Sequence, residues 1–152
     1  MPGVTSATAA PVLAGVPLTS TEGAAGFSVV SGHLDPDDPA SRIDWSALSR
    51  SGTNLVILMG VRHLPAIGAR LMKEGIAPDA AAACIADASL PTQRVVRSRL
   101  GDLPAAVAAA GLTNPATLII ETRPHESARA MAERWCEQAG GGGLEIAEGQ
   151  YR

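Results

Sequence analysis

A chain of 152 residues with 46% apolar content is long enough to bury one substantial hydrophobic core. The formal net charge is −3 and the aromatic content is 3%, so neither a phosphate-binding basic surface nor a base-stacking platform is expected. The apolar runs are too short to span a bilayer, and no basic stretch precedes an apolar segment at the amino terminus. We therefore expect a soluble, cytoplasmic domain that binds neither nucleic acid nor membranes.

The first predicted element is a short helix over residues 5–13, which Gly15 and Pro17 terminate. A β-prone run follows at residues 27–30. Residues 35–39 read Asp-Pro-Asp-Asp-Pro and favour an exposed loop over a strand or a helix. Their prolines disrupt the pattern of a calcium-binding loop, so we interpret this loop as solvated.

The middle of the chain predicts two helices and a buried strand. Asp44 is a candidate cap for a short helix over residues 45–49. Residues 54–59 form a continuous apolar run, which is typical of a strand buried on both faces. Apolar residues then recur at helical spacing until Gly75, and this predicts an amphipathic helix whose apolar face carries Leu64, Ile67, Leu71 and Met72.

Three more strands are predicted in the second half of the chain. Residues 80–86 indicate a strand because turn-forming residues flank them, although their alanines leave a helix as the competing interpretation. Residues 93–100 alternate enough to indicate a half-exposed strand, and residues 117–120 form the last one. Asp102 is a candidate cap for an alanine-rich helix over residues 103–110.

This pattern amounts to about five strands and four or five helices, with connections that are both short and helical. We therefore expect an α/β domain with a mixed five-stranded sheet flanked by helices. The last helix is predicted over residues 126–138, because small and apolar residues share one of its faces. The glycine run at 140–143 predicts that the tail, residues 139–152, is disordered.

The sequence contains no Gly-x-Ser-x-Gly, His-Glu-x-x-His, Walker or GxGxxG motif. Its two cysteines, Cys84 and Cys136, form neither a CxxC pair nor a zinc site, and Cys84 is interpreted as a small buried hydrophobe. The histidines His33, His63 and His125 fall in separate loops or element ends. We therefore assign no catalytic residue and expect no metal.

Two segments are candidates for ligand binding. Met59 and Gly60 end the buried strand, where crevices form in open α/β sheets and where a glycine lets a ligand approach the backbone. A core methionine and a turn glycine are the alternative. Thr5 and Ser6 precede the first helix, so their hydroxyls and the nearby amides suit a polar ligand group, although capping explains them equally well.

A family resemblance covers almost everything from Pro2 to about Ile120. It rests on motifs in family-like order and spacing: Pro2-Gly-Val-Thr-Ser-Ala, Ala14-Gly-Val-Pro-Leu-Thr, Val30-Ser-Gly-His, Asp44-Trp, Thr53-Asn-Leu-Val-Ile-Leu-Met-Gly, residues 71–75, Gln93-Arg-Val-Val and Pro115-Ala. In this order they resemble the C-terminal half of the tetrapyrrole methylase family, and in particular its uroporphyrinogen-III C-methyltransferase branch. The resemblance begins at the hinge between the family's two domains.

The resemblance implies an S-adenosylmethionine-dependent methyltransferase that converts uroporphyrinogen III to precorrin-2, on the way to sirohaem and cobalamin. In the family the cofactor lies between two domains, so residues 1–20 would be a hinge segment with a short helix and residues 21–138 the C-terminal domain. The Gly-rich cofactor loop and the proposed acid/base residues belong to the N-terminal domain, which has no counterpart in this sequence. We expect this half to be inactive alone, and to need a tetrapyrrole substrate and an N-terminal methylase domain, or a second copy, as partners.

Matched position by position, the resemblance implies that Thr5 and Ser6 meet the cofactor and that Met59 and Gly60 form the Met-Gly turn that packs against it. Ala88 stands at a cofactor-contacting position where the family has glycine.

The chain also departs from the family at Ser20 and Thr21, where His-Arg is usual, at Ala81, where proline is usual, and at Glu121, where glycine is usual. A cation suited to the carboxylates of the macrocycle is therefore missing from its family position. These departures keep other functions open: a non-catalytic relic or association module, another tetrapyrrole methylase such as a precorrin methyltransferase, or a fold relative acting on RNA or diphthamide.

Overall fold

The computed structural model describes residues 2–21 and 23–123. The helix predicted over residues 126–138, the predicted disordered tail at 139–152, His125 and Cys136 lie outside the described residues.

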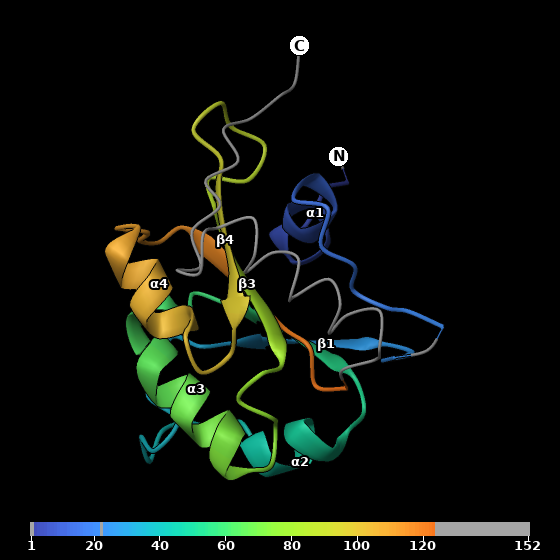
Figure 1. The fold of residues 1–152 in the computed structure, drawn as a ribbon, viewed down its shortest axis with the longest axis vertical. Coiled ribbons are helices and arrows are strands. Elements are labelled where there is room, and N and C mark those ends of the chain that lie inside the picture. The colour runs from blue at the N-terminus through green and yellow to red at the C-terminus, as the bar shows by residue number, and fades with distance from the viewer. Residues whose placement is uncertain (1, 22, 124–152) are drawn as a thin grey trace.

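Helices and strands follow one another along the described chain, and two strands come in direct succession in its second half, as Figure 1 shows. The α-helices are α1 (Ser6–Leu13), α2 (Trp45–Arg50), α3 (Leu64–Lys73) and α4 (Leu103–Ala109), and a short 3-10 helix, η1 (Val61–His63), leads into α3. The strands are β1 (Phe27–Ser31), β2 (Asn54–Leu58), β3 (Ala81–Ala86), β4 (Arg94–Arg99) and β5 (Ala116–Ile120). The predicted elements in this part of the chain are confirmed, with small differences at their ends.

Local chemistry explains where the helices begin. The Thr5 hydroxyl accepts a hydrogen bond from the Ala7 N–H at 3.2 Å, and the Asp44 carboxylate accepts one from the Ala47 N–H at 2.8 Å. Asp102 stands at the start of α4, but its side chain makes no capping hydrogen bond. That part of the prediction is wrong. Proline in the first turn of α4 leaves one backbone N–H fewer to satisfy.

The five strands form one mixed sheet in the order β1-β2-β5-β3-β4. β1 pairs in parallel with β2, whereas β5 lies antiparallel to both β2 and β3, and β4 lies antiparallel to β3. Antiparallel pairing on both sides of β3 explains why residues 80–86 form a strand, because their neighbours supply backbone partners that local propensity does not reveal. The mixed five-stranded sheet is confirmed.

The two faces of the sheet are covered differently. The larger apolar cluster lies beneath α2, α3 and α4 and includes the fully buried Trp45, Leu71 and Leu118. On the other face α1 packs against the sheet through alanines, of which Ala10 is completely buried. Figure 1 shows α1 apart from α3 and α4, across the sheet from them. Among the described helices, none is both long and apolar enough to cross a membrane.

Candidate ligand-binding cleft

A cleft of about 780 Å³ opens at one edge of the sheet. β1, β2 and β3 run in the same direction, because β2 is parallel to β1 and both β2 and β3 are antiparallel to β5. Their carboxyl ends therefore meet at this edge, beside the amino end of β5. Each of these four strand ends contributes side chains to the cleft, including His33, Met59, Asp87 and Ala116. Crevices at this position bind ligands in open α/β sheets.

The backbone is held in an unfavourable conformation at two of these strand ends. Met59, Asp87 and Ser89 are the described non-glycine residues with positive φ, at 58°, 52° and 73°. Such a conformation costs about 1–2 kcal/mol for a residue with a side chain. Met59 follows β2 directly, is 54% exposed and lines the cleft together with Asp87. Backbone of this kind is common where a protein shapes a binding site.

Gly60 does not line the cleft but lies buried directly after Met59. A Cβ atom on Gly60 would stand 2.8 Å from Cγ2 of Ile57 and 2.9 Å from Cδ1 of Leu118. These distances are too short for carbon atoms, so core packing alone requires glycine here. Of the predicted Met-Gly pair, Met59 lines the cleft, and Gly60 packs in the core directly after it.

The start of α1 reaches the same cleft. Ser6, the first residue of α1, is part of the lining, whereas Thr5 is not. The Thr5 hydroxyl is engaged in capping α1, as the hydrogen bond to the Ala7 N–H shows. The sequence left capping and ligand binding as alternatives for this pair, and the structure gives Thr5 the capping role and places Ser6 in the cleft.

Ala88 lines the cleft two residues after β3 and packs on the apolar cluster beneath α1. The buried Gln93 holds the loop that carries Ala88, since its side-chain oxygen accepts a hydrogen bond from the Ser89 N–H at 3.0 Å. The neighbouring Arg94 donates to the carbonyl of Ala110 at the end of α4. Of the Gln-Arg pair in the family-like motif, Gln93 therefore supports the wall of the cleft, whereas Arg94 ties the start of β4 to the end of α4.

The other departures from the family pattern lie away from the cleft. The Ser20 hydroxyl accepts a hydrogen bond from the Gly23 N–H at 2.8 Å within a turn. Glu121 and Ala81 are neighbours at the opposite edge of the sheet, where the Glu121 N–H donates to the Ala81 carbonyl at 2.9 Å. Neither pair of departures, Ser20-Thr21 nor Ala81-Glu121, lines the cleft.

The structure brings charged residues into the cleft that the sequence did not single out as a group. Arg62 and His63 of η1 line it together with His33, and Asp87 lies at the end of β3. His33 and His63 are 30 positions apart in numbering and were predicted only to occupy separate element ends. The strand order brings the two histidines to the same cleft, and no local signal in the sequence predicts that order. Within the described residues, no group of three or more His, Cys, Asp or Glu side chains is arranged to hold a metal.

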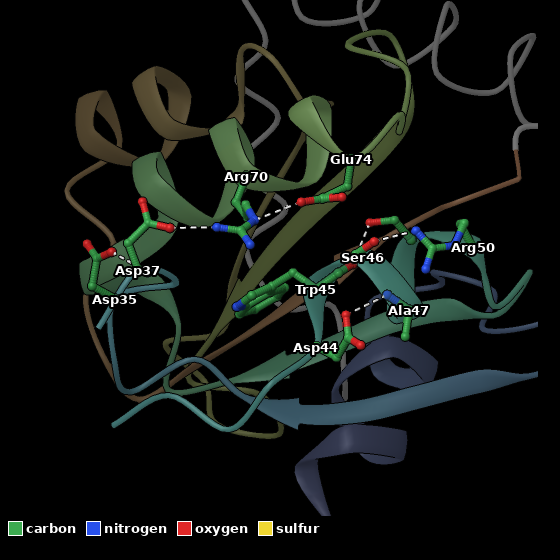
Figure 2. Close-up of polar contacts among 10 residues, drawn as sticks. Asp35, Asp37, Asp44, Trp45, Ser46, Ala47, Arg50, Arg70 and Glu74 are labelled. Carbon is green, nitrogen blue, oxygen red and sulfur yellow. Dashed lines mark hydrogen bonds and ion pairs between the residues drawn. The ribbon is translucent and has the colours of Figure 1, made fainter. Parts of the chain in front are cut away.

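The acidic loop after β1 is anchored beside the cleft by α3. Figure 2 shows Arg70 between two carboxylates: its Nη1 donates to Asp37 at 2.6 Å and its Nε to Glu74 at 2.9 Å. Asp35 in turn accepts a hydrogen bond from the Asp37 N–H at 2.9 Å. The Asp37 side chain is nevertheless 81% exposed, so the predicted solvated loop is confirmed, with an anchor that the sequence did not indicate.

Cys84 lies in the middle of β3 and is completely buried. Burial in apolar surroundings raises the pKa of its thiol to about 12. The thiol therefore stays protonated at neutral pH, and a protonated thiol is a poor nucleophile. The interpretation of Cys84 as a small buried hydrophobe is confirmed.

Comparison with known proteins defines the class of protein to which this cleft belongs. The family model for Tetrapyrrole (Corrin/Porphyrin) Methylases matches residues 1–104. The chain belongs to the tetrapyrrole methylase family.

Two curated relatives and one solved structure show which members of the family this chain is similar to. The chain is 40% identical to a uroporphyrinogen-III C-methyltransferase of Pseudomonas aeruginosa over 78% of its own length and 47% of the relative. It is also 40% identical to an S-adenosyl-L-methionine-dependent uroporphyrinogen III methyltransferase of Methanosarcina barkeri, over 68% of this chain and 40% of the relative. The uroporphyrin-III C-methyl transferase of Thermus thermophilus, solved with S-adenosylhomocysteine, is 32% identical with a TM-score of 0.62, over 80% of this chain and 51% of that one.

The chain thus spans about half or less of the length of the curated relatives it matches. The cobalt precorrin-4 methyltransferase structure, which is 20% identical with a TM-score of 0.68, shares the fold.

Proposed function

We propose that this chain is the C-terminal half of an S-adenosylmethionine-dependent uroporphyrinogen-III C-methyltransferase. One observation carries the proposal: Ser6, Met59 and Ala88, which match cofactor-contacting positions of the family, come from three separate segments and line one cleft. Thr5 and Gly60 complete the set by fixing the backbone on which Ser6 and Met59 stand. The proposed reaction is the methylation of uroporphyrinogen III to precorrin-2.

The cleft suits S-adenosylmethionine in size and in chemistry. Its volume of about 780 Å³ falls within the range of small-molecule sites, roughly 300–1,000 Å³. Its walls combine apolar side chains, among them Ile85 and Leu90, with the polar groups of Ser6 and Asp87. An adenine ring would find apolar surface there, and the ribose and amino acid groups would find hydrogen-bonding partners.

The bound cofactor supplies a methyl group on a sulfonium, which a nucleophilic ring carbon of the substrate accepts. Methyl transfer depends mainly on holding donor and acceptor in line and away from water. Met59 and Ser6 would hold the cofactor from the β2 and α1 sides, and the loop after β3 would form the opposite wall. We assign the proton-handling groups to the N-terminal domain of the complete enzyme.

An N-terminal methylase domain is the partner that this half would require. Apolar residues are strongly exposed at the cleft and near the start of α1: Val4 at 85%, Met59 at 54% and Leu90 at 54%. Exposed apolar surface beside a half-formed cleft is what an interdomain contact would bury. The length of the relatives supports the same partner, whether it resides on a separate chain or on a longer form of this one.

A chimera tests the proposal. The chain would replace the matching segment of the Pseudomonas aeruginosa relative, and release of S-adenosylhomocysteine would be measured with uroporphyrinogen III as substrate. We expect methyl transfer by the chimera and very little by the chain alone. A folded chimera that binds S-adenosylhomocysteine yet transfers no methyl group would contradict the proposal and favour the non-catalytic binding module.

A further inference from the structure

The charged side chains of the cleft are distributed unevenly along it. His33 follows β1 and Arg62 and His63 follow β2, so the basic residues gather at the β1–β2 end. Asp87 follows β3, on the far side of β5. Neighbouring strands lie about 4.8 Å apart, which places the ends of β2 and β3 roughly 10 Å from each other. The cleft therefore has a basic end and an acidic end.

The described protein neutralises the basic end only in part, because Arg62 keeps its charge without a partner among the described residues. Arg62 is exposed and makes no hydrogen bond or ion pair with any described residue. His33 shares one hydrogen bond, between Nδ1 and the Ser31 hydroxyl at 2.9 Å. The Asp35 carboxylate lies 3.9 Å from Nδ1 of His63 and forms an ion pair with it when the histidine is protonated. A guanidinium that lines a cleft and has no partner among residues 2–21 and 23–123 is available to an anionic ligand.

The two ligands of the proposed reaction differ in charge, as the two ends of the cleft do. Uroporphyrinogen carries carboxylate side chains around its rim, whereas S-adenosylmethionine carries a sulfonium, an ammonium and one carboxylate, and so has a net positive charge. We infer that the β1–β2 end of the cleft binds a carboxylate side chain of the tetrapyrrole through Arg62, assisted by His33 and His63. The cofactor then occupies the β3 end, with Asp87 facing its positive groups. This inference rests on the proposed function and assigns each ligand its side of the cleft.

Arg62 suits this role better than the other two residues. A guanidinium presents paired N–H donors that match the two oxygens of a carboxylate, and it keeps its charge across the physiological pH range. Arg62 also lies in the cleft itself, whereas Ser20 and Thr21, where His-Arg is usual in the family, do not line it.

The test compares two probes on four variants of the full chain, of which Arg62→Lys serves as the conservative replacement. Uroporphyrin III, a fluorescent and air-stable macrocycle with the carboxylate side chains of the substrate, reports on the basic end by fluorescence titration. S-Adenosylhomocysteine reports on the acidic end by calorimetry. The other variants are Arg62→Gln, Asp87→Asn and a control, Arg99→Gln. Arg99 is also exposed but lies at the end of β4, on the opposite edge of the sheet.

We expect Arg62→Gln to weaken uroporphyrin binding about fivefold or more, as loss of a charge-assisted hydrogen bond does, and Arg62→Lys to recover part of it. Asp87→Asn should instead weaken S-adenosylhomocysteine binding and spare uroporphyrin. Equal losses of uroporphyrin affinity in Arg62→Gln and Arg99→Gln, or no loss in either, would overturn the inference. Failure of the unaltered chain to bind S-adenosylhomocysteine would count against the proposed function, so the two failures are distinguishable.

Discussion

Gly32 and Gly60 touch backbone to backbone behind the cleft. A Cβ atom on Gly32 would lie 2.8 Å from the Cα of Gly60, and the Gly32 N–H donates to the Leu58 carbonyl at 2.7 Å. The segments that leave β1 and β2 are thereby locked together. These two segments carry His33 and Met59, so the contact sets the spacing between the basic end of the cleft and the proposed cofactor position.

Replacing Gly60 by alanine tests this contact. The new methyl group would stand less than 3 Å from Ile57 and Leu118, so we expect a loss of about 1–3 kcal/mol of unfolding free energy in urea titrations, as for other overpacked cores. Gly3→Ala is the matched control, because nothing lies within 4 Å of a Cβ at that position. Equal stability of the two variants would show that the segments are not locked.

Two substitutions of Met59 test both its strained backbone and its proposed contact with the cofactor. Its φ of 58° is tolerated by glycine but strained for any residue with a Cβ. We therefore expect Met59→Gly to be more stable than Met59→Ala by about 0.5–1 kcal/mol, while both bind S-adenosylhomocysteine more weakly than the unaltered chain. An alanine variant as stable as the glycine variant would argue against strain, and unchanged affinity in both would remove Met59 from the site.

Cys84 provides a pH-dependent test of the core. The native thiol has a pKa of about 12 against an ordinary value of 9.0, so the native state keeps its proton while the unfolded state releases it above pH 9. The contribution of Cys84 to stability is thus fully present below pH 9 and is lost as the pH rises towards 12. In a Cys136→Ser background, the unfolding free energy should fall more between about pH 8 and about pH 10 than in the same protein with Cys84→Ala.

The same single-cysteine protein should resist thiol reagents until it unfolds. Labelling should therefore follow the urea unfolding curve. Rapid labelling of the folded protein, or identical pH dependence with and without Cys84, would show that the thiol is not buried as described.

Much of the fold could be predicted because the relevant signals are local. The continuous apolar run of β2 and the helical spacing of Leu64, Ile67 and Leu71 indicate their own structure. Strand order is a different matter, since it depends on pairing between segments distant in the sequence. Nothing local places β5 between β2 and β3, and the alanine run of β3 is decided as a strand only by its two antiparallel neighbours.

The residues of the candidate site likewise fall into those that local signals predict and those whose grouping depends on strand order. Met59 and Ser6 could be predicted, because a strand end and a helix start carry their own signals and the family-like motifs coincide with them. The group formed by His33, Arg62, His63 and Asp87 could not, because it exists only once the carboxyl ends of β1, β2 and β3 share an edge. Likewise, the sequence offered ligand approach and a turn as reasons for Gly60, and the core packing that requires glycine there becomes visible only in the structure.

Calorimetric titration of the 152-residue chain with S-adenosylhomocysteine tests the central claim most directly, with Ala88→Trp to fill the β3 wall of the cleft and Val12→Ser as a control. Val12 is 73% exposed on α1 and does not line the cleft. We predict saturable binding that Ala88→Trp abolishes and Val12→Ser leaves unchanged. The account is contradicted if no binding occurs, with or without an added N-terminal methylase domain, or if binding persists undiminished in the Ala88→Trp variant.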